Sequence, residues 1–193
     1  MEFQKTGEIQ ENSDEGKSKK MELQLKPISE QDPWYGEAQR LYETSFPPNE
    51  RRTFPELFDD FHGACEIMSA MEGNRFIGMT VLLTYKDITH ILYIAIEENL
   101  RSRGYGSRML DLIRKQYPDQ KIIADLERPE EDAQNEPQRE SRVAFYRKNG
   151  YSFTGIDYRW EGEDYCIMSN GGNLSHDAFQ NFWGHFYPRQ NVS

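Results

Sequence analysis

The strongest constraint on the fold of this 193-residue chain is a short apolar strand that runs through a glycine-rich turn into a helix. The strand is Ile91–Ile96, and the turn reads Arg101-Ser-Arg-Gly104-Tyr-Gly106-Ser. Glycines at such positions let the backbone approach a ligand and direct its N–H groups toward one point, while the helix N-terminus adds a partial positive charge. We therefore expect a phosphate or pyrophosphate at this turn, and Arg101 and Arg103 strengthen that expectation.

Other interpretations of the turn are open. It could be an ordinary glycine-rich connection that binds nothing. A dinucleotide-binding fingerprint needs a third glycine where Met109 stands, although Asp125 lies about twenty residues after the turn, as the ribose-binding acid of such a site would. The chain also lacks the repeated βαβ units of a dinucleotide-binding domain. No Gly-Lys-Ser/Thr follows the glycines, which excludes an NTPase phosphate loop.

The remaining hydrophobic patterns predict an α/β (α+β) chain in which helices pack on a mixed sheet. Strands are expected at Met21–Pro27, Cys65–Met71, Phe76–Tyr85, Ile91–Ile96, Lys121–Leu126, Tyr151–Tyr158 and Asp164–Ser169. Helices are expected between Asp32-Pro33 and Pro47-Pro48, at Phe54–Phe61, Gly104–Tyr117 and Gln138–Asn149, and after the capping residue Ser175.

The N-terminal segment differs in composition from the rest. Residues 1–20 are polar, with Met1, Phe3 and Ile9 as their only sizeable apolar side chains, so we expect a disordered tail. Residues 21–193 contain no internal repeat and no linker-like run, and we expect them to form a single domain.

Composition and charge exclude several functional classes. No apolar run approaches the ~20 residues of a membrane helix, and no signal peptide is visible. Two cysteines, Cys65 and Cys166, argue against a disulfide framework and favour a reducing, cytoplasmic location. The formal net charge of -10 argues against a general nucleic-acid binder and electrostatically favours a cationic or amine substrate.

A second motif lies at the end of the helix that Gly150 is expected to stop. It reads Ala144-Phe-Tyr146-Arg-Lys148-Asn-Gly150-Tyr151, and it resembles the Tyr-x-Lys-x-Gly-Phe-like element of the GNAT superfamily of acyl-CoA-dependent N-acetyltransferases. The turn matches the same family's Arg/Gln-x-x-Gly-x-Gly/Ala motif through Arg101, Gly104 and Gly106. Both motifs stand in the family's order, with a predicted strand between them.

The resemblance extends from Met21 to Ser169, which is most of the chain. It implies a GNAT-like mixed, mostly antiparallel central sheet of about six to seven strands flanked by helices. The sequence has Glu98 where the family often has proline, and Tyr151 where the second motif usually ends in phenylalanine. Neither departure touches the phosphate turn.

By this resemblance the chain is an acyltransferase that passes the acetyl group of acetyl-CoA directly to a primary amine of a small molecule or peptide. The pyrophosphate would bind backbone N–H groups of the turn, and the pantetheine arm would follow the preceding strand. The N–H of Ile96 would stabilise the developing oxyanion. The residues implied in co-substrate binding are Ile94, Ile96, Arg101, Ser102, Arg103, Gly104, Tyr105, Gly106 and Ser107.

Two proton transfers accompany such a reaction. An alkyl amine with a pKa near 10.4 is neutral in only about one molecule in 2,500 at pH 7, so a base or a water relay is needed. We favour Glu127 as that base, with Glu97 as the second candidate; either could instead be a solvated loop carboxylate. Tyr146 resembles the family's general acid, which protonates the leaving thiolate, although it could also be a half-buried aromatic side chain. His90, at a strand start, is expected to be structural or exposed.

The acceptor is not defined by the sequence. The family's specificity segments correspond to Phe46–Arg52 and Glu127–Glu140. The second segment is acidic and favours a cationic acceptor, whereas Arg51 and Arg52 could hold a carboxylate or phosphate.

No metal is expected, because the four histidines show no ligand spacing with one another or with the cysteines. The aromatic stripe Phe179, Phe182, Trp183 and Phe186 favours a core position or a homodimer face. A non-catalytic acyl-CoA-binding or sensing module and a nicotinamide-dependent oxidoreductase are the alternative functions. Tyr146 favours the enzyme, because a sensor has no need of a general acid.

Overall fold

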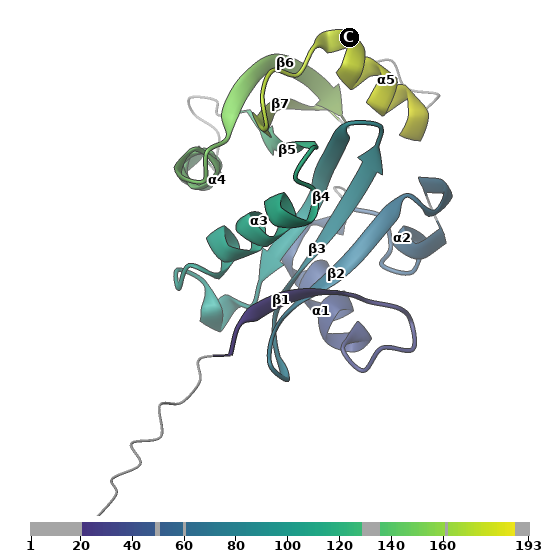
Figure 1. The fold of residues 1–193 in the computed structure, drawn as a ribbon, viewed down its shortest axis with the longest axis vertical. Coiled ribbons are helices and arrows are strands. Elements are labelled where there is room, and N and C mark those ends of the chain that lie inside the picture. Colours follow the sequence, from purple (N-terminus) through teal and green to yellow (C-terminus); the bar gives the residue numbers. More distant parts are fainter. Residues whose placement is uncertain (1–20, 49–50, 60, 129–135, 161, 188–193) are drawn as a thin grey trace, which may run out of the picture.

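A central sheet organises the described part of the chain, with seven strands in the order β1-β2-β3-β4-β5-β7-β6 (Figure 1). The computed structural model describes residues 21–48, 51–59, 61–128, 136–160 and 162–187. The expected tail, residues 1–20, lies outside the described residues. The strands are β1 (Leu23–Pro27), β2 (Cys65–Glu72), β3 (Arg75–Tyr85), β4 (Ile88–Ile96), β5 (Lys121–Glu127), β6 (Ser152–Trp160) and β7 (Glu163–Asn170). The helices are α1 (Tyr35–Ser45), α2 (Glu56–Asp59), α3 (Tyr105–Gln116), α4 (Glu136–Lys148) and α5 (His176–Phe186), with 3-10 turns at Phe61–Gly63 and Glu98–Leu100.

Neighbouring strands pair antiparallel except β4 and β5, which run parallel. A parallel pair needs a long crossover connection, and α3 lies in the connection between these two strands. The predicted mixed, mostly antiparallel sheet flanked by helices is therefore confirmed.

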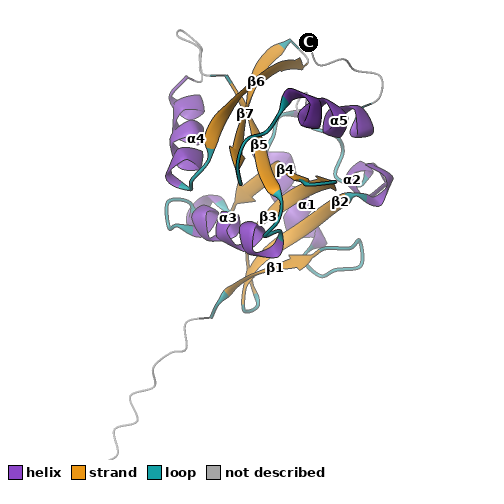
Figure 2. Cartoon of the chain, turned by 45° about the horizontal axis from the view of Figure 1, so that its top comes forward, coloured by secondary structure: helices purple, strands orange, loops and turns teal. Residues whose placement is uncertain are grey.

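The helices cover both faces of the sheet. Leu41 of α1, Leu57 of α2 and Phe182 of α5 belong to one buried cluster. Leu110 of α3 and Val143 of α4 belong to another, on the opposite face. Figure 1 shows α3 in front of the strands and α1 behind them, and Figure 2 shows the same arrangement from another angle.

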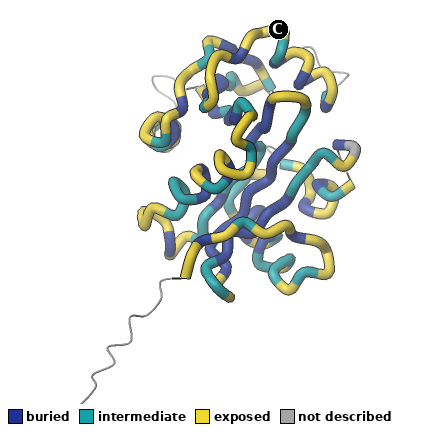
Figure 3. Tube along the Cα trace, viewed as in Figure 1, coloured by how far each residue is buried: buried dark blue, intermediate teal, exposed yellow. Residues whose placement is uncertain are grey.

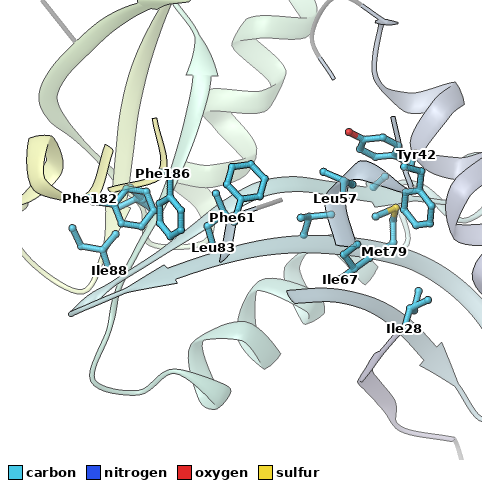
Figure 4. Packing of buried hydrophobic residues seen from close by; sticks show 14 of the residues in the cluster. Ile28, Tyr42, Leu57, Phe61, Ile67, Met79, Leu83, Ile88, Phe182 and Phe186 are labelled. Carbon is cyan, nitrogen blue, oxygen red and sulfur yellow. The ribbon is translucent and has the colours of Figure 1, made fainter. Parts of the chain in front are cut away.

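The core follows the central strands. Eight consecutive residues of β3, from Phe76 to Leu83, are buried, and Figure 3 shows the buried trace concentrated along β2, β3 and β4. The aromatic stripe of α5 belongs to this core, because its side chains are at most 8% exposed. Figure 4 shows Phe182 and Phe186 beside Phe61 and Leu83. Burial of such side chains contributes about 1.5–3 kcal/mol each, so this helix is an integral layer of the domain.

The sheet opens between β4 and β5. Their parallel pairing covers only Ile88–Ile91 of β4 and Lys121–Ala124 of β5. Directly after Ile91, the β3–β4 ladder passes over Leu92, which has no pairing partner on β3 and forms a β-bulge. A bulge bends a strand and increases its twist. The second half of β4 therefore stays with β3 while β5 diverges from it.

The strand expected at Ile91–Ile96 begins earlier than predicted, at Ile88. Thr89 and His90 interrupt the apolar pattern, but both pair with β3 on one side and with β5 on the other. Pairing on two sides outweighs the local polarity, which is why the sequence pattern placed the boundary too late.

The first two helices, by contrast, are shorter than predicted. The first begins at Tyr35, and the Asp32 carboxylate accepts a hydrogen bond from the Trp34 N–H at 3.0 Å, which stabilises the turn before the helix. The helix expected at Phe54–Phe61 is a single turn, Glu56–Asp59. Phe61 has a φ of 63°, in the left-handed region, and a helix cannot continue through that conformation.

Candidate functional site

A cleft of about 580 Å³ occupies the opening between β4 and β5, and we call it the β4–β5 cleft. Its walls come from the second half of β4, the turn before α3, the start of α3 and the inner side of α4. The cleft lies where a parallel pairing ends, so strand edges and a helix N-terminus face the same space. Such a position combines hydrogen-bonding backbone with a favourable dipole for anions.

The edge of β4 that faces the cleft directs backbone N–H groups toward it. The N–H of Glu97 donates to the carbonyl of Ile77 on β3 at 3.0 Å. Backbone groups alternate in direction along a strand, so the N–H groups of Ile94 and Ile96 point away from β3, toward the cleft. Among the described residues, β5 pairs with β4 no further than Ile91. A ligand with amide groups could add to this edge as a further strand would.

The N-terminus of α3 presents a group of unpaired N–H donors to the same cleft. The N–H of Arg108 donates to the carbonyl of Gly104 at 3.1 Å, as the first intrahelical bond. The N–H groups of Tyr105, Gly106 and Ser107 precede that bond, and a helix leaves such groups without an intrahelical acceptor. Gly104 caps the helix with a φ of 81°, a conformation that glycine adopts without steric cost.

Contacts on both sides hold this turn in place. The Tyr105 hydroxyl donates to Glu72 of β2 at 2.9 Å, and the Arg108 guanidinium donates to the same carboxylate at 3.2 Å. On the other side, a Cβ added to Gly106 would lie 3.1 Å from the ring of Phe145 in α4. Glycine at this position therefore permits α3 and α4 to approach closely at the wall of the cleft.

The structure brings together eight of the nine residues that the sequence assigned to co-substrate binding. These eight line the β4–β5 cleft: Ile94, Ile96, Arg101, Ser102, Gly104, Tyr105, Gly106 and Ser107. Arg103 is exposed on the same turn and is not among the lining residues. The side-chain Nε of Arg101 donates to the Ile96 carbonyl at 3.3 Å, while the N–H of Arg101 donates to Glu98.

The cleft is locally positive in an acidic chain. Arg101, Arg142 and Lys148 line it, together with the N-terminus of α3. Among the described lining residues, Asp125 is the single carboxylate. These positive groups favour a polyanionic ligand in the cleft.

Tyr146 of α4 also lines the cleft, and it is 6% exposed. Burial raises the pKa of its hydroxyl above the ordinary value, and the nearby Tyr151 and Asp125 raise it further, against a smaller opposing effect of Arg142. The phenol is therefore protonated at neutral pH and can donate to a group in the cleft.

A second cavity of about 340 Å³, which we call the aromatic cavity, shares part of its wall with the cleft. Eight of its fifteen described lining residues are Phe, Tyr or Trp. They include Phe46 after α1, Tyr158 and Trp160 of β6, and Trp183 of α5. The first predicted specificity segment, Phe46–Arg52, therefore contributes to the wall of this cavity. Residues 129–135 of the second segment, Glu127–Glu140, lie outside the described residues.

The two candidate bases occupy different places. Glu127 ends β5, lines the aromatic cavity and is 6% exposed. Its Oε2 lies 3.4 Å from Nε of Arg139 and 3.5 Å from Nη1 of Arg142. Glu97 forms an ion pair with Arg40 and lines neither cavity. Glu127 is thus a buried, positioned carboxylate, not a solvated loop residue.

The sequence suggested Asp125 only as a ribose-binding acid, but in the structure this partly buried carboxylate connects the two cavities. Asp125 lies in the wall that they share. Its Oδ1 is 2.8 Å from Nε2 of His90, and its Oδ2 accepts a hydrogen bond from the Tyr158 hydroxyl. Burial alone raises the pKa of Asp125, but His90 and the hydrogen bonds from His90 and Tyr158 outweigh it and lower the pKa. Asp125 is therefore a partly buried anion.

A sequence model of the acetyltransferase (GNAT) family matches residues 35–151, which is more than half of the chain and contains both motifs. The chain belongs to the GNAT acetyltransferase family. The GNAT assignment makes it an acyltransferase, as the resemblance predicted. The search of curated proteins gives no match.

Solved structures show the same GNAT fold. An acetyltransferase of this family from Bacteroides thetaiotaomicron is 26% identical, with a TM-score of 0.67 over 80% of this chain and 89% of that one. A Bacillus subtilis acetyltransferase in complex with CoA has a TM-score of 0.53 at 19% identity, covering 80% of this chain and 100% of that one. An Elizabethkingia anophelis GNAT acetyltransferase with acetyl-CoA bound has a TM-score of 0.52 at 19% identity, covering 76% and 96%.

The dinucleotide interpretation of the turn is wrong for this GNAT chain. The described sheet has one parallel pair, so it lacks the repeated βαβ units of a dinucleotide-binding domain. Asp125, the candidate ribose-binding acid, instead bonds to His90 and Tyr158. Over the described ranges no three His, Cys, Asp or Glu side chains gather as metal ligands, and no helix there is long and apolar enough to cross a membrane.

Proposed function

We propose that this GNAT protein transfers the acetyl group of acetyl-CoA to a primary amine of a small molecule or peptide by direct attack. One observation carries the proposal: the free edge of β4, the unpaired N–H groups of Tyr105–Ser107 and the side chain of Tyr146 meet at a single cleft. An amide-containing arm, a pyrophosphate and a leaving thiolate are the three parts of an acyl-CoA that these features suit.

The residues present fit an acyl-CoA in charge and in backbone geometry. The N–H groups of Tyr105–Ser107, with Arg101 nearby, would hold the pyrophosphate. The backbone N–H groups of Ile94 and Ile96 would hydrogen-bond the amide arm. When bound, acetyl-CoA supplies a thioester whose acyl carbon an amine can attack.

The chain's own residues would manage charge and protons in this reaction. The N–H of Ile96, fixed by the β3–β4 ladder, would stabilise negative charge on the acyl oxygen. Tyr146 would donate its hydroxyl proton to the leaving sulfur, because burial keeps that group protonated. Glu127 would accept the amine proton, directly or through water, from the side of the aromatic cavity.

Glu127→Gln is expected to lower kcat/KM at least tenfold, because the substitution removes the proton acceptor but keeps the side chain's size. Glu97→Gln should stay within about twofold, since Glu97 pairs with Arg40 outside both cavities. Steady-state thiol release by the two variants measures this difference. The reverse ranking would assign the base to Glu97, and acetyl-CoA affinity serves as the check that each variant is folded.

Calorimetric titration with acetyl-CoA, using NADH as the control ligand, tests the proposal itself. Binding of acetyl-CoA but not NADH, followed by thiol release with members of an amine library, is the expected result. Binding without thiol release for any amine would favour the non-catalytic acyl-CoA-binding module. Absence of acetyl-CoA binding would contradict the assignment of the β4–β5 cleft.

A further inference from the structure

The aromatic cavity is positioned to present a second molecule to the β4–β5 cleft. The two share wall residues, among them Tyr93, Asp125 and Arg142. The volume of about 340 Å³ lies at the small end of ligand pockets, so it suits a compact molecule and not a folded partner. Its wall is dominated by aromatic rings, which stabilise both apolar groups and cations.

Asp125 provides the negative charge at the junction of the two cavities. Its side chain is 17% exposed, although both oxygens already accept hydrogen bonds, from His90 and Tyr158. An ionised carboxylate has about four lone-pair sites, so each oxygen can accept another donor. A partly exposed anion beside aromatic faces is an arrangement that can recognise an ammonium group.

The side chain of His90 holds this carboxylate, and Asp125 is its hydrogen-bond partner within the described structure. Its ring is 1% exposed, and its Nδ1 is buried without a hydrogen-bond partner in the described residues. Nε2 is therefore the ring nitrogen that forms a hydrogen bond, and its partner is Asp125. A buried histidine with one ring nitrogen left unsatisfied carries a cost, which fits a role in fixing the position of Asp125.

The remaining charges limit the number of positive groups that the cavity can accept. Among its described lining residues, Arg51, Arg52 and Arg142 stand against the two carboxylates of Asp125 and Glu127. Glu127 is already paired with Arg139 and Arg142. A ligand with a second ammonium group would meet arginines, whereas a ligand with one ammonium group would meet Asp125.

We propose that the aromatic cavity binds the acceptor as a monocationic amine on a compact aromatic body, with its ammonium group on Asp125. The assignment rests on the proposed function, because it makes this molecule the one that receives the acetyl group. Asp125 would hold the amine at the entrance to the β4–β5 cleft, and Glu127 lies two residues further along β5, on the same face. The amine proton could then pass toward Glu127 before attack.

Wild-type protein tests the substrate class without any substitution. The probes are 2-phenylethylamine, the neutral isostere 2-phenylethanol as an inhibitor, and the aliphatic diamine putrescine. We expect 2-phenylethylamine to be acetylated with a kcat/KM at least tenfold above that of putrescine. We also expect 2-phenylethanol to bind at least tenfold more weakly than the amine. Equal binding of the alcohol, or a preference for putrescine, would overturn the proposal.

Asp125→Asn tests the anchoring residue, because it removes the charge while keeping the size. We expect at least a tenfold rise in KM for 2-phenylethylamine, with acetyl-CoA affinity within about twofold of wild type. Asp111→Asn is the matched control, since Asp111 is exposed on α3, pairs with Arg114 and lines neither cavity. Tyr158→Phe, which removes one hydrogen bond to Asp125, should raise the same KM by a smaller factor.

The anchoring role of Asp125 and the proposed function can fail separately. An unchanged KM in folded Asp125→Asn would overturn the anchoring role even if acetyl-CoA binds as expected. Loss of acetyl-CoA binding by the wild-type protein would instead contradict the proposed function. If Asp125→Asn does not fold, the wild-type comparison of 2-phenylethylamine with 2-phenylethanol is sufficient to test whether the cavity binds a monocationic amine.

Discussion

Tyr146→Phe is expected to lower kcat by about 10²–10⁴ while leaving acetyl-CoA affinity near the wild-type value. The substitution removes one hydroxyl from a buried ring at the cleft wall and keeps the packing of the ring. Because the pKa of Tyr146 is raised above its ordinary value, the wild-type hydroxyl stays protonated through neutral and mildly alkaline pH. Wild-type kcat should therefore show no loss from ionisation of Tyr146 until the pH exceeds about 10. Steady-state kinetics across this range, with calorimetry for acetyl-CoA, measures both quantities.

Tyr151→Phe is the matched control for this prediction. Its ring lies 5.1 Å from that of Tyr146, it is also buried, and burial raises its pKa as well. Tyr151 lines neither cavity, so loss of its hydroxyl should leave kcat within about twofold. Equal losses of kcat in both variants would show that the effect comes from packing. An unchanged kcat in Tyr146→Phe would show that Tyr146 is not the general acid.

Local sequence patterns predicted most of the fold, because each strand and helix is encoded by residues close together in the chain. The turn at Gly104 and Gly106 and the helix that carries Tyr146 lie where the two motifs placed them. The first three residues of β4, Ile88–His90, were missed, since their pairing with β5 joins residues more than thirty positions apart. Such pairing adds stability that no local window contains.

The aromatic cavity was harder to predict for a related reason. Asp125, His90 and Tyr158 come from three strands, and their meeting depends on the register of a parallel pair and two antiparallel ones. One signal was present in the sequence: Asp125 is a charged residue within the apolar run Lys121–Leu126. A buried charge needs a partner, so that position could have been recognised as part of a site, although not which residues would pair with it.

The two candidate bases illustrate the same limit. The sequence placed Glu127 and Glu97 each at the end of a strand beside the expected cleft, and it favoured Glu127 without showing what either carboxylate contacts. The structure separates them through distant partners, Arg40 for Glu97 and the pair Arg139 and Arg142 for Glu127. Side-chain partners of this kind depend on tertiary packing, and a single sequence does not contain them.

Gly104→Ala is expected to weaken acetyl-CoA binding at least tenfold. Gly104 caps α3 with a φ of 81°, and a residue with a Cβ is destabilised in that conformation by roughly 1–2 kcal/mol. An added Cβ would meet no other atom within 4 Å, so the backbone strain is not relieved or worsened by packing. We expect the turn to relax by moving the N–H groups of Tyr105–Ser107 away from the position that binds phosphate. Calorimetric titration with acetyl-CoA gives the change in affinity.

Gly155→Ala is a close control for this effect. Gly155 on β6 has a φ of 79°, its added Cβ would also meet no atom within 4 Å, and it lines neither cavity. The two substitutions therefore introduce the same methyl group and nearly the same backbone strain, and thermal unfolding should show similar losses of stability. Only Gly104→Ala should lose affinity for acetyl-CoA. If both variants bound it equally well, the unpaired N–H groups at the start of α3 would have a role in the fold alone, and the pyrophosphate would have to be placed elsewhere.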